Sequence, residues 1–380
     1  MSSHAHLTDG ERALLERTEA LARDVLAPIA AAGEPGRIDR PLLGALAEHG
    51  LLGRLFAGEG DVAAIELCLI REALARHCTE AETAFAVQGL GAFPILSAGR
   101  PDVVERWLPR LAAGEAAAGF ALTEPDAGSD VAALALRAER DGDGFRLTGT
   151  KQWISNAPEA EVYSVFARTT EGAGARGLTA FAVARDSEGL GGEAIALVSP
   201  HPIGRLHFDG VFVPGDCVLG EVDRGMRVAM GTLDLFRPSV GAFAVGMAQA
   251  ALDAAVAHAS SRQAFGRPLR DFQGVSHRLA DVATKVQAAR LLVHAAARAY
   301  DAGQRPVTQA AAMAKLFATE TAQEAVDAAI QVHGAAALQQ GHVLEHLYRE
   351  VRAPRIYEGA SEIQREIIAR QLFEAARMEA

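Results

Sequence analysis

Residues 355–364 have the sequence RIYEGASEIQ and place one carboxylate, Glu358, just ahead of a predicted helix. Ser361 or Ala360 is suited to open this helix, because isoleucines and a leucine recur behind it at helical spacing. The stretch therefore marks a junction between an irregular loop and the last long helix of the chain.

The immediate neighbours of Glu358 are of the kind that make a carboxylate suited to act as a base. Gly359 tolerates backbone angles closed to other residues and lets a ligand approach the backbone. Tyr357 and Ile356 offer apolar walls, which disfavour a charged carboxylate and raise its pKa. Such a carboxylate is suited to removing a proton from carbon. The alternative is an ordinary loop glutamate, because structural ion pairs also perturb carboxylates.

Composition limits the class of protein. The chain has 380 residues, typical of two or three domains, and its 49% hydrophobic content is ample for sizeable cores. It carries 37 Lys and Arg against 48 Asp and Glu, a formal net charge of −11. This balance argues against nucleic acid or an anionic membrane surface as a general partner.

Three cysteines without a C-x-x-C pair (Cys68, Cys78 and Cys217) are typical of reduced thiols in the cytosol. The N-terminus shows no basic and apolar leader, and no apolar run is long enough to span a bilayer. We therefore expect a soluble, cytoplasmic protein.

The hydrophobic period changes twice along the chain. Helical patterns fill about 7–111, with capping boxes expected at Thr8 with Glu11 and at Thr79 with Glu82. Short alternating or apolar runs between glycine-rich turns follow over about 119–220. Alanine-rich helices then occupy about 238–262, 271–302 and 308–338. We predict an α+β protein: an N-terminal helical domain (1–117), a middle antiparallel β-sandwich or barrel (118–222) and a C-terminal helical bundle (223–380).

Some motif matches do not fit their context. A G-x-G-x-x-G match at 172–177 precedes a predicted strand, whereas a dinucleotide fingerprint opens a helix. His342, Glu345 and His346 share one helix face, but no further ligand group is near them in the sequence, so we do not predict a metal site.

Three other clusters are suited to a ligand. FALTEPDAGSD at 120–130 is a loop rich in small residues and hydrogen-bond donors, although an ordinary Pro-Asp turn has a similar composition. KQWISN at 151–156 sets an indole beside a hydroxyl, and a core tryptophan is the alternative. RQAFGR at 262–267 ends a long helix with arginines, where either a phosphate or solvent is a suitable neighbour.

Together these motifs resemble those of the acyl-CoA dehydrogenase family over nearly the whole chain. The matching patterns are T-E-P-x-x-G-S-D at 123–130, K-x-W-I-[ST]-N at 151–156, R-x-x-F-G at 262–266, Q-[IV]-x-G at 331–334 and I-Y-E-G-[TA]-[SN]-[EQ]-I-Q at 356–364. The order and spacing of five motifs leave little room for chance.

The resemblance implies FAD bound between a middle β-domain and a helical bundle, in a homo-oligomer arranged as a dimer of dimers. Residues implied to hold the flavin within one subunit are Phe120, Leu122, Thr123, Gly128, Ser129, Trp153, Ser155, Ala360 and Glu362. Residues implied to reach the FAD of a neighbouring subunit are Arg262, Phe265, Gln273, Gln331, Gly334 and Ala335.

The same resemblance implies α,β-dehydrogenation of an acyl-CoA thioester. Glu358 matches the base that removes the α proton, while flavin N5 accepts a hydride from the β carbon. Residues implied to contact the substrate are Ser129, Asp234, Arg237, Tyr357 and Gly359. The family passes its electrons to an electron-transfer flavoprotein.

Several positions depart from the family pattern. Phe236 stands where some branches carry their base, which leaves Glu358 as the candidate. Ala360 lacks the hydroxyl of the more common threonine, and Ala335 replaces a second glycine. At 199–207 the chain lacks the usual strand motif that contacts CoA, so His201 or Arg205 would have to substitute, or the acyl group is bound to a carrier protein.

Two other functions remain open on the sequence. A flavin oxidase or monooxygenase on the same scaffold reacts with oxygen and commonly lacks the glutamate. A flavin-free helical interaction protein would not need the flavin motifs. Chain length, branching or ring character of an acyl group does not follow from the sequence.

Overall fold

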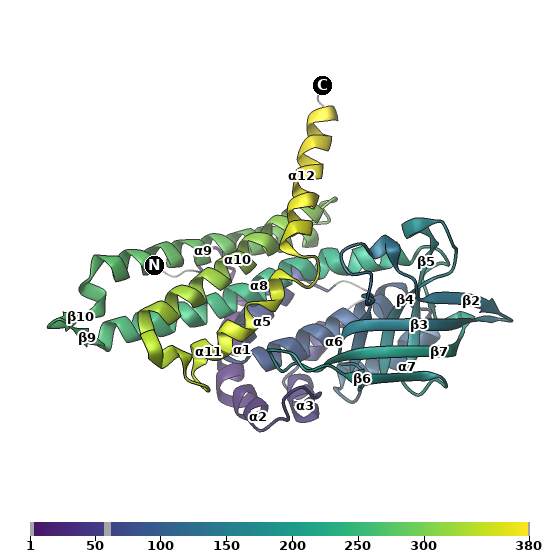
Figure 1. Cartoon of the computed structure of the whole chain (residues 1–380), viewed down its shortest axis with the longest axis horizontal. Helices are drawn as coiled ribbons and strands as arrows, with labels where there is room; N and C mark the ends of the chain where they lie inside the picture. The colour runs from purple at the N-terminus through teal and green to yellow at the C-terminus, as the bar shows by residue number, and fades with distance from the viewer. Residues whose placement is uncertain (1–3, 57–61, 379–380) are drawn as a thin grey trace. The chain divides into compact units, whose positions relative to one another are not determined.

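The computed structural model describes residues 4–56 and 62–378, which form two compact units. One unit, here called the helical unit, comprises Met1–Val25, Ala63–Glu82 and Asp234–Ala380. The other, the sheet unit, comprises Leu26–Val62 and Thr83–Leu233. Figure 1 shows the elements of both.

The helical unit is a bundle with a two-stranded hairpin at the joint between two of its long helices (Figure 1). Its elements are α1 (Asp9–Leu21), the π-helical η1 (Ala22–Leu26, whose last residue belongs to the sheet unit), α5 (Ala64–His77), α8 (Gly225–Ser261), β9 (Gln263–Ala264), β10 (Arg267–Pro268), η5 (Leu269–Asp271), α9 (Gln273–Asp301), α10 (Thr308–His333), η6 (Gly334–Leu338), α11 (Val343–Glu350), η7 (Ala353–Arg355) and α12 (Ser361–Met378). The first residues of α8, up to Leu233, belong to the sheet unit.

The sheet unit combines short helices with one sheet of eight strands. Its helical elements are α2 (Ala27–Ala31), α3 (Arg40–Glu48), α4 (Leu51–Arg54), α6 (Thr79–Ala98, whose first turn belongs to the helical unit), α7 (Pro101–Ala112), η2 (Val131–Ala133), η3 (Gly174–Gly177) and η4 (Gly215–Cys217). Its strands are β1 (Ala118–Ala121), β2 (Arg137–Asp141), β3 (Gly144–Ser155), β4 (Val162–Arg168), β5 (Leu178–Ala184), β6 (Leu190–Ala194), β7 (Ile203–Pro214) and β8 (Val218–Leu219).

The strand order is β6-β7-β3-β2-β4-β5-β8, and β1 pairs with β4. Most pairings are antiparallel, as predicted, but β1 and β2 each pair with β4 in parallel. The two central strands β4 and β5 are buried on both faces, which explains why they read as apolar runs instead of alternating. The predicted order of helices, sheet and helices is confirmed.

Each face of the sheet contributes to its own hydrophobic cluster. On one face, Phe145 and Phe181 meet edge to face with ring centroids 5.3 Å apart. On the other, Phe166 packs with Trp107 of α7 and Leu111. The sheet is therefore packed on both faces, and the loops of the site leave from buried strands.

Small residues allow close packing in the helical unit. A Cβ at Gly246 of α8 would overlap the backbone carbonyl oxygen of Glu72 in α5, so these two helices approach closely. Glu72 is itself buried and bonds Arg290 of α9 at 2.7 Å. Burial alone would raise the pKa of Glu72, but Arg290 and two histidines lower it well below the usual range.

Two local expectations are corrected. α8 begins at Gly225 rather than near Pro238 and passes through that proline. The expectation that no apolar run could span a bilayer is also corrected, because α8 is long and apolar enough to do so by length and composition alone. However, 67% of its most apolar window is buried within the protein, which is typical of the core helix of a soluble protein.

The capping box at Thr8 and Glu11 is confirmed, whereas the one at Thr79 and Glu82 is wrong. The Thr79 hydroxyl instead contacts Nε2 of His346 at 2.6 Å, and the Glu82 carboxylate pairs with Arg71. Partners that are distant in the sequence thus take the place of the predicted hydrogen bonds between these side chains and the backbone of the first helical turn.

Candidate active site

Glu358 lies in the helical unit, in the short loop between η7 and α12, and α12 begins at Ser361 as predicted. Both Glu358 (φ 51°) and Gly359 (φ 92°) have left-handed backbone conformations. A Cβ at position 359 would lie 2.5 Å from the side-chain nitrogen of Gln364, so glycine is required there for space as well as for conformation.

Side chains from two helices hold this loop. The Lys315 ammonium, from α10, donates a hydrogen bond of 2.7 Å to the Gly359 carbonyl oxygen. Nε2 of Gln364, from α12, donates to the carbonyl oxygens of Gly359 and Glu358 at 2.9 and 3.3 Å. These bonds fix the direction in which the Glu358 side chain leaves the backbone.

The Glu358 carboxylate is half-buried, and three cations surround it at longer range. Burial raises the pKa of Glu358, while Arg71, Lys315 and Arg237 partly lower it again. Its Oε2 atom is buried and accepts no hydrogen bond from any residue within the described ranges 4–56 and 62–378. A poorly solvated carboxylate without a hydrogen-bond donor is suited to accept a proton from a ligand.

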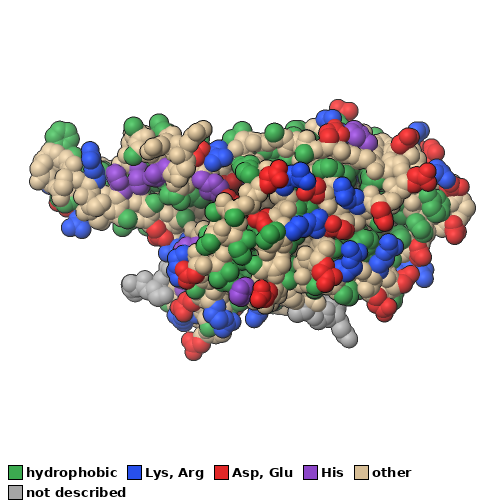
Figure 2. Space-filling model, turned by 90° about the horizontal axis from the view of Figure 1, so that it is seen from below, with side chains coloured by type: hydrophobic (Ala, Val, Ile, Leu, Met, Phe, Trp, Pro, Cys, Tyr) green, Lys and Arg blue, Asp and Glu red, His purple; other side chains and the backbone are tan. Residues whose placement is uncertain are grey.

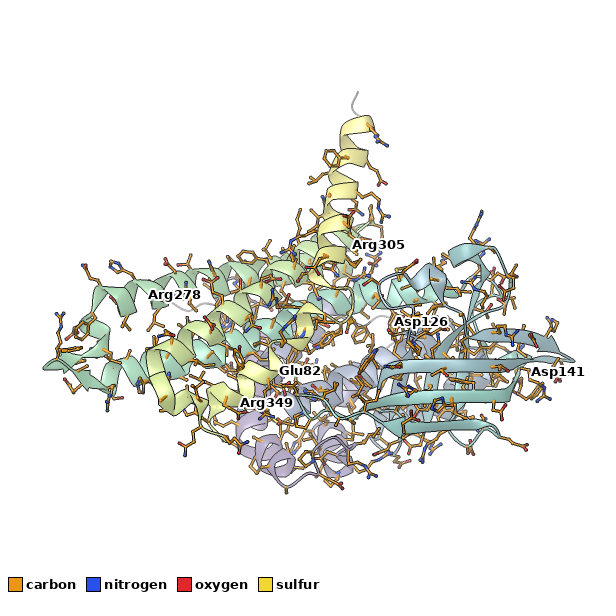
Figure 3. All side chains as sticks on the ribbon, in the orientation of Figure 1. Glu82, Asp126, Asp141, Arg278, Arg305 and Arg349 are labelled. Carbon is orange, nitrogen blue, oxygen red and sulfur yellow. The ribbon has the colours of Figure 1, made fainter. Side chains whose placement is uncertain are left out.

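Arg71 is held rigidly beside this site. Its buried guanidinium pairs with Glu82 and donates to Oγ of Ser239 at 2.6 Å (Glu82 is labelled in Figure 3). Burial, followed by the nearby Glu82, raises the pKa of Tyr357 well above its usual range. The predicted apolar wall is therefore incomplete: Ile356 is 58% exposed, and a buried ion pair lies near the tyrosine.

Asp234 and Arg237, the predicted substrate contacts, lie one turn apart on α8. Arg237 is 5% exposed, and its Nη1 lies 3.4 Å from Oδ1 of Asp234. Its Nε is buried and finds no hydrogen-bond partner in the described part of the chain. Burial raises the pKa of Asp234, which Arg237 partly offsets. Phe236, between them, is fully buried.

Sequence reasoning missed Arg71, Glu82, Ser239, Lys315 and Gln364. They come from helices α5, α6, α8, α10 and α12. Buried lysines and arginines are rare unless they are paired. A lysine or arginine within an otherwise apolar helix, such as Lys315 or Arg71, was therefore a signal of a site residue.

In the sheet unit, a buried ion pair anchors the loop that follows β1. The Lys151 ammonium, which is fully buried, donates to Oε1 of Glu124 and to the Leu122 carbonyl oxygen, each at 2.8 Å. The Glu124 carboxylate also accepts from the backbone of Ala135 and Leu136 at 2.6 and 2.9 Å. Burial lowers the pKa of Lys151 to about 8, despite the attraction of Glu124.

This anchoring leaves the tip of the loop at the surface. Backbone N–H of Gln152 donates to the Thr123 carbonyl oxygen at 2.9 Å, which ties the loop to β3. Asp126 marks the exposed tip (Figure 3), and Ser129 is also exposed. Phe120 packs against Phe166 with tilted rings, whose centroids lie 5.0 Å apart. The backbone of Thr123 is therefore held and Ala127 is buried, while residues 125–126 and 128–130 are exposed.

Trp153 is not a core tryptophan. It lies at an irregularity in the pairing of β3 with β7, has φ 61°, and is 48% exposed. Asn156 is left-handed as well (φ 64°), and its side-chain amide donates to the Ala118 carbonyl oxygen at 2.9 Å. The strand is thus bent to present the indole and the nearby Ser155, which is partly exposed.

At the end of the bundle, the helical unit brings together the segments around 262 and 331–335. His258 of α8 stacks on His333 of α10 at 4.1 Å, and Figure 2 shows histidine side chains in a row on this part of the surface. Arg262, Gln331 and Ala335 are exposed here, and Gly334 has φ 65°. Phe265, 95% exposed, occupies the tip between β9 and β10. Gln273 opens α9.

Of the two residues predicted to substitute in CoA recognition, His201 and Arg205, the arginine already has partners. Arg205 donates to Glu193 at 2.9 Å and to Gln152 at 3.0 Å, and His207 contacts Glu193 at 2.7 Å. The Arg205 guanidinium would have to leave these partners to bind a phosphate.

The two histidines considered for a metal have other partners. His342 accepts from the backbone of Leu344 at 3.1 Å and so caps α11, and His346 contacts Thr79. Within the described ranges, no three metal-ligating side chains group together.

Comparison with known proteins identifies the family to which the chain belongs. The family models of the acyl-CoA dehydrogenase N-terminal, middle and C-terminal domains match residues 8–115, 119–211 and 223–373. The chain belongs to the acyl-CoA dehydrogenase family.

Individual relatives extend over nearly the same length. Cyclohexane-1-carbonyl-CoA dehydrogenase of Geobacter metallireducens is 36% identical over 96% of this chain and 98% of its own. The solved butyryl-CoA dehydrogenase of Megasphaera elsdenii superposes with a TM-score of 0.90 at 31% identity, covering 97% and 99% of the two chains. An FAD complex of PigA gives a TM-score of 0.90 at 27% identity, over 96% and 98%.

Acyl-CoA dehydrogenases are flavoprotein oxidoreductases, and FAD is the cofactor of this family member. Each unit, taken by itself, has exposed groups of a kind that suits part of FAD. In the sheet unit, the exposed Trp153 offers a ring face, as a flavin ring requires. In the helical unit, the exposed Arg262 and Phe265 offer a charge and an aromatic ring, as a diphosphate and an adenine require. Gly334 is left-handed, and its open surroundings allow close approach of a ligand.

Proposed function

We propose that this protein removes the α proton and β hydride of an acyl-CoA thioester, with Glu358 as the base. The observation that carries the proposal is the Glu358 carboxylate itself. It combines a buried oxygen that no described residue bonds, a pKa raised by burial, and a backbone held by Lys315 and Gln364. A base of this kind is poorly solvated and well aimed, as proton abstraction from carbon requires.

In the proposed reaction, one Cα–H bond and one Cβ–H bond of the acyl group break and a Cα=Cβ double bond forms. Oε2 of Glu358 takes the α proton. The N–H of Glu358, beside the side-chain-free Gly359, is suited to stabilise the charge that develops on the thioester oxygen. FAD, when bound, supplies the acceptor for the hydride. Electrons then pass to an electron-transfer flavoprotein in our proposal, since acyl-CoA dehydrogenases use one.

Arg237 is proposed to bind the CoA portion through its buried Nε, which has no hydrogen-bond partner among the residues that the structure describes. Arg237→Ala is expected to raise KM for an acyl-CoA by more than it lowers kcat, because loss of uniform binding appears in KM. Steady-state kinetics with an artificial electron acceptor measure both constants. Arg227→Ala, at an exposed arginine on the same helix, is the control. Equal falls in kcat and kcat/KM would instead place Arg237 in the chemical step.

The proposed oligomer is a homotetramer that carries FAD. Large apolar side chains are exposed at the end of the bundle and on α12, namely Phe265 (95%), Leu338 (69%) and Phe373 (69%). We infer that these exposed apolar side chains are buried against other subunits. We expect light scattering after size exclusion to give four chains with bound yellow flavin. A monomer that binds no added FAD would contradict the proposal.

The substrate is best narrowed by a panel of straight, branched and cyclic acyl-CoA thioesters, each followed by bleaching of the flavin absorbance under anaerobic conditions. Acyl-pantetheine thioesters form the second arm, because Arg205 is already paired and a carrier-bound acyl group presents pantetheine without the adenosine portion. Bleaching by none of these thioesters would reject the proposed reaction. Rapid reoxidation by oxygen alone would favour the oxidase alternative.

A further inference from the structure

Lys315 is an unusual residue for the middle of an alanine-rich helix. Its side chain is fully buried, between Ala314 and Leu316 on α10. Burial lowers the pKa of its ammonium to about 8, although Glu358 attracts the charge. A lysine is rarely retained in such a position unless its charge or its hydrogen bond is used.

The charges around Glu358 can be matched into pairs within the helical unit. Arg71 pairs with Glu82, and Arg237 pairs with Asp234. Lys315 forms no ion pair of this kind with any residue in the described ranges, and it donates its hydrogen bond to the Gly359 carbonyl oxygen. Of the three cations near Glu358, Lys315 is therefore the one that forms no direct ion pair with another carboxylate of residues 4–56 and 62–378.

The bond from Lys315 also acts on the base through the backbone. Glu358 and Gly359 are consecutive left-handed residues, a conformation that persists only when surrounding groups hold it. Lys315 and Gln364 supply these groups from α10 and α12, on the two sides of the Gly359 carbonyl. A single ammonium thus contacts the residue next to the base and lies in electrostatic reach of its carboxylate.

We propose that Lys315 is a positioning residue for Glu358, which fixes the loop through the Gly359 carbonyl and keeps the carboxylate ionised. The inference rests on the proposed role of Glu358 as the base. Arg71 lowers the pKa of Glu358 more than Lys315 does, and Arg237 lowers it less. Arg71 and Arg237 bond Glu82 and Asp234, whereas Lys315 also donates to the Gly359 carbonyl oxygen of the loop that carries the base. Arginine substitutes imperfectly, since the contact is made by a compact point charge.

The groups that face the pair come from several elements. Glu358 faces Arg71 of α5, Arg237 of α8 and Lys315 of α10. Lys315 faces, besides Glu358 and Arg237, the carboxylates of Glu320 on its own helix and Glu362 on α12. Glu320 bonds Arg355 and Ser361, so its charge is largely taken up.

The direct test titrates Glu358 without any substrate. A water-soluble carbodiimide modifies protonated carboxyls, and mass spectrometry of the Glu358 peptide gives the midpoint pH of labelling in the FAD-loaded enzyme. We expect Lys315→Met to move this midpoint upward by about one pH unit or more, the effect of losing a unit charge at close range. Lys315→Gln, which keeps a donor for Gly359 but no charge, should move it likewise. Lys315→Arg should restore most of the wild-type midpoint.

The second readout is the pH profile of flavin reduction by an acyl-CoA that the wild type accepts. The acid limb of Lys315→Met should shift upward with the labelling midpoint, so that the loss of rate is largest at low pH. An unchanged midpoint, with rate lost equally at all pH values, overturns the proposal and leaves a purely structural lysine. If Lys315→Met does not retain FAD, Lys315→Gln and Lys315→Arg provide the same comparison between an uncharged and a charged side chain at this position. A wild type inactive on every thioester would reject the base role, while the labelling midpoint would still test Lys315 separately.

Discussion

Glu358→Gln is expected to slow flavin reduction by acyl-CoA by about 10²–10⁴-fold, the usual contribution of a positioned general base. The glutamine keeps the shape of the side chain and the two bonds that hold the Gly359 carbonyl. It removes the carboxylate that we propose as the acceptor of the α proton. FAD content and the flavin spectrum should therefore remain those of the wild type, and stopped-flow absorbance under anaerobic conditions measures the rate.

The control is Glu366→Gln, at an exposed position eight residues along the chain on α12. It removes the same charge without touching the loop and should leave the rate unchanged. In the wild type, the rate should rise with pH through a midpoint above the ordinary glutamate range, because burial raises the pKa of Glu358 and the base must be ionised to act. Near-normal reduction by Glu358→Gln would show that another group is the base.

Lys151→Met is expected to destabilise the sheet unit by about 3–5 kcal/mol, the cost of breaking a buried ion pair by removing one partner. Methionine has a similar volume, so the loss comes from the hydrogen bonds to Leu122 and Glu124 and from the buried carboxylate left without its cation. Both tryptophans, Trp107 and Trp153, lie in the sheet unit, so tryptophan fluorescence during urea unfolding reports on that unit.

The double variant Lys151→Met with Glu124→Gln should regain part of this loss, because no unpaired charge stays buried. Arg146→Met, in the same unit, is the control. That arginine pairs with Asp141 at 2.7 Å but its side chain is 53% exposed, and an exposed pair contributes at most about 1 kcal/mol. If Lys151→Met unfolds at the same urea concentration as Arg146→Met, the buried pair does not anchor the loop.

Local patterns in the sequence determined a good part of this protein. The helix start at Ser361, the capping box at Thr8 and the change from helices to strands and back are all present in the structure. These features depend on residues within about one turn or one hairpin of each other, so neighbouring positions in the sequence are enough to predict them. The family motifs are of the same kind, and the comparisons confirm the family they indicate.

Where a local signal competed with a distant partner, the sequence alone misled. Thr79 and Glu82 have the spacing of a capping box, yet Glu82 pairs with Arg71. The sequence left open whether Trp153 lies beside a ligand or in the core, and the irregular pairing of β3 with β7 leaves its indole exposed. At Thr79 and Glu82, the tertiary contacts contributed more free energy than the local arrangement that they replaced.

The sequence determined that a carboxylate at position 358 precedes a helix, with a glycine beside it. Only the tertiary structure decided how that carboxylate behaves. The cations that adjust its pKa, Arg71, Lys315 and Arg237, come from α5, α10 and α8 and are separated by scores of residues along the chain. Electrostatic energy depends on distance and burial in space, and neither quantity is expressed in the spacing of residues along a sequence.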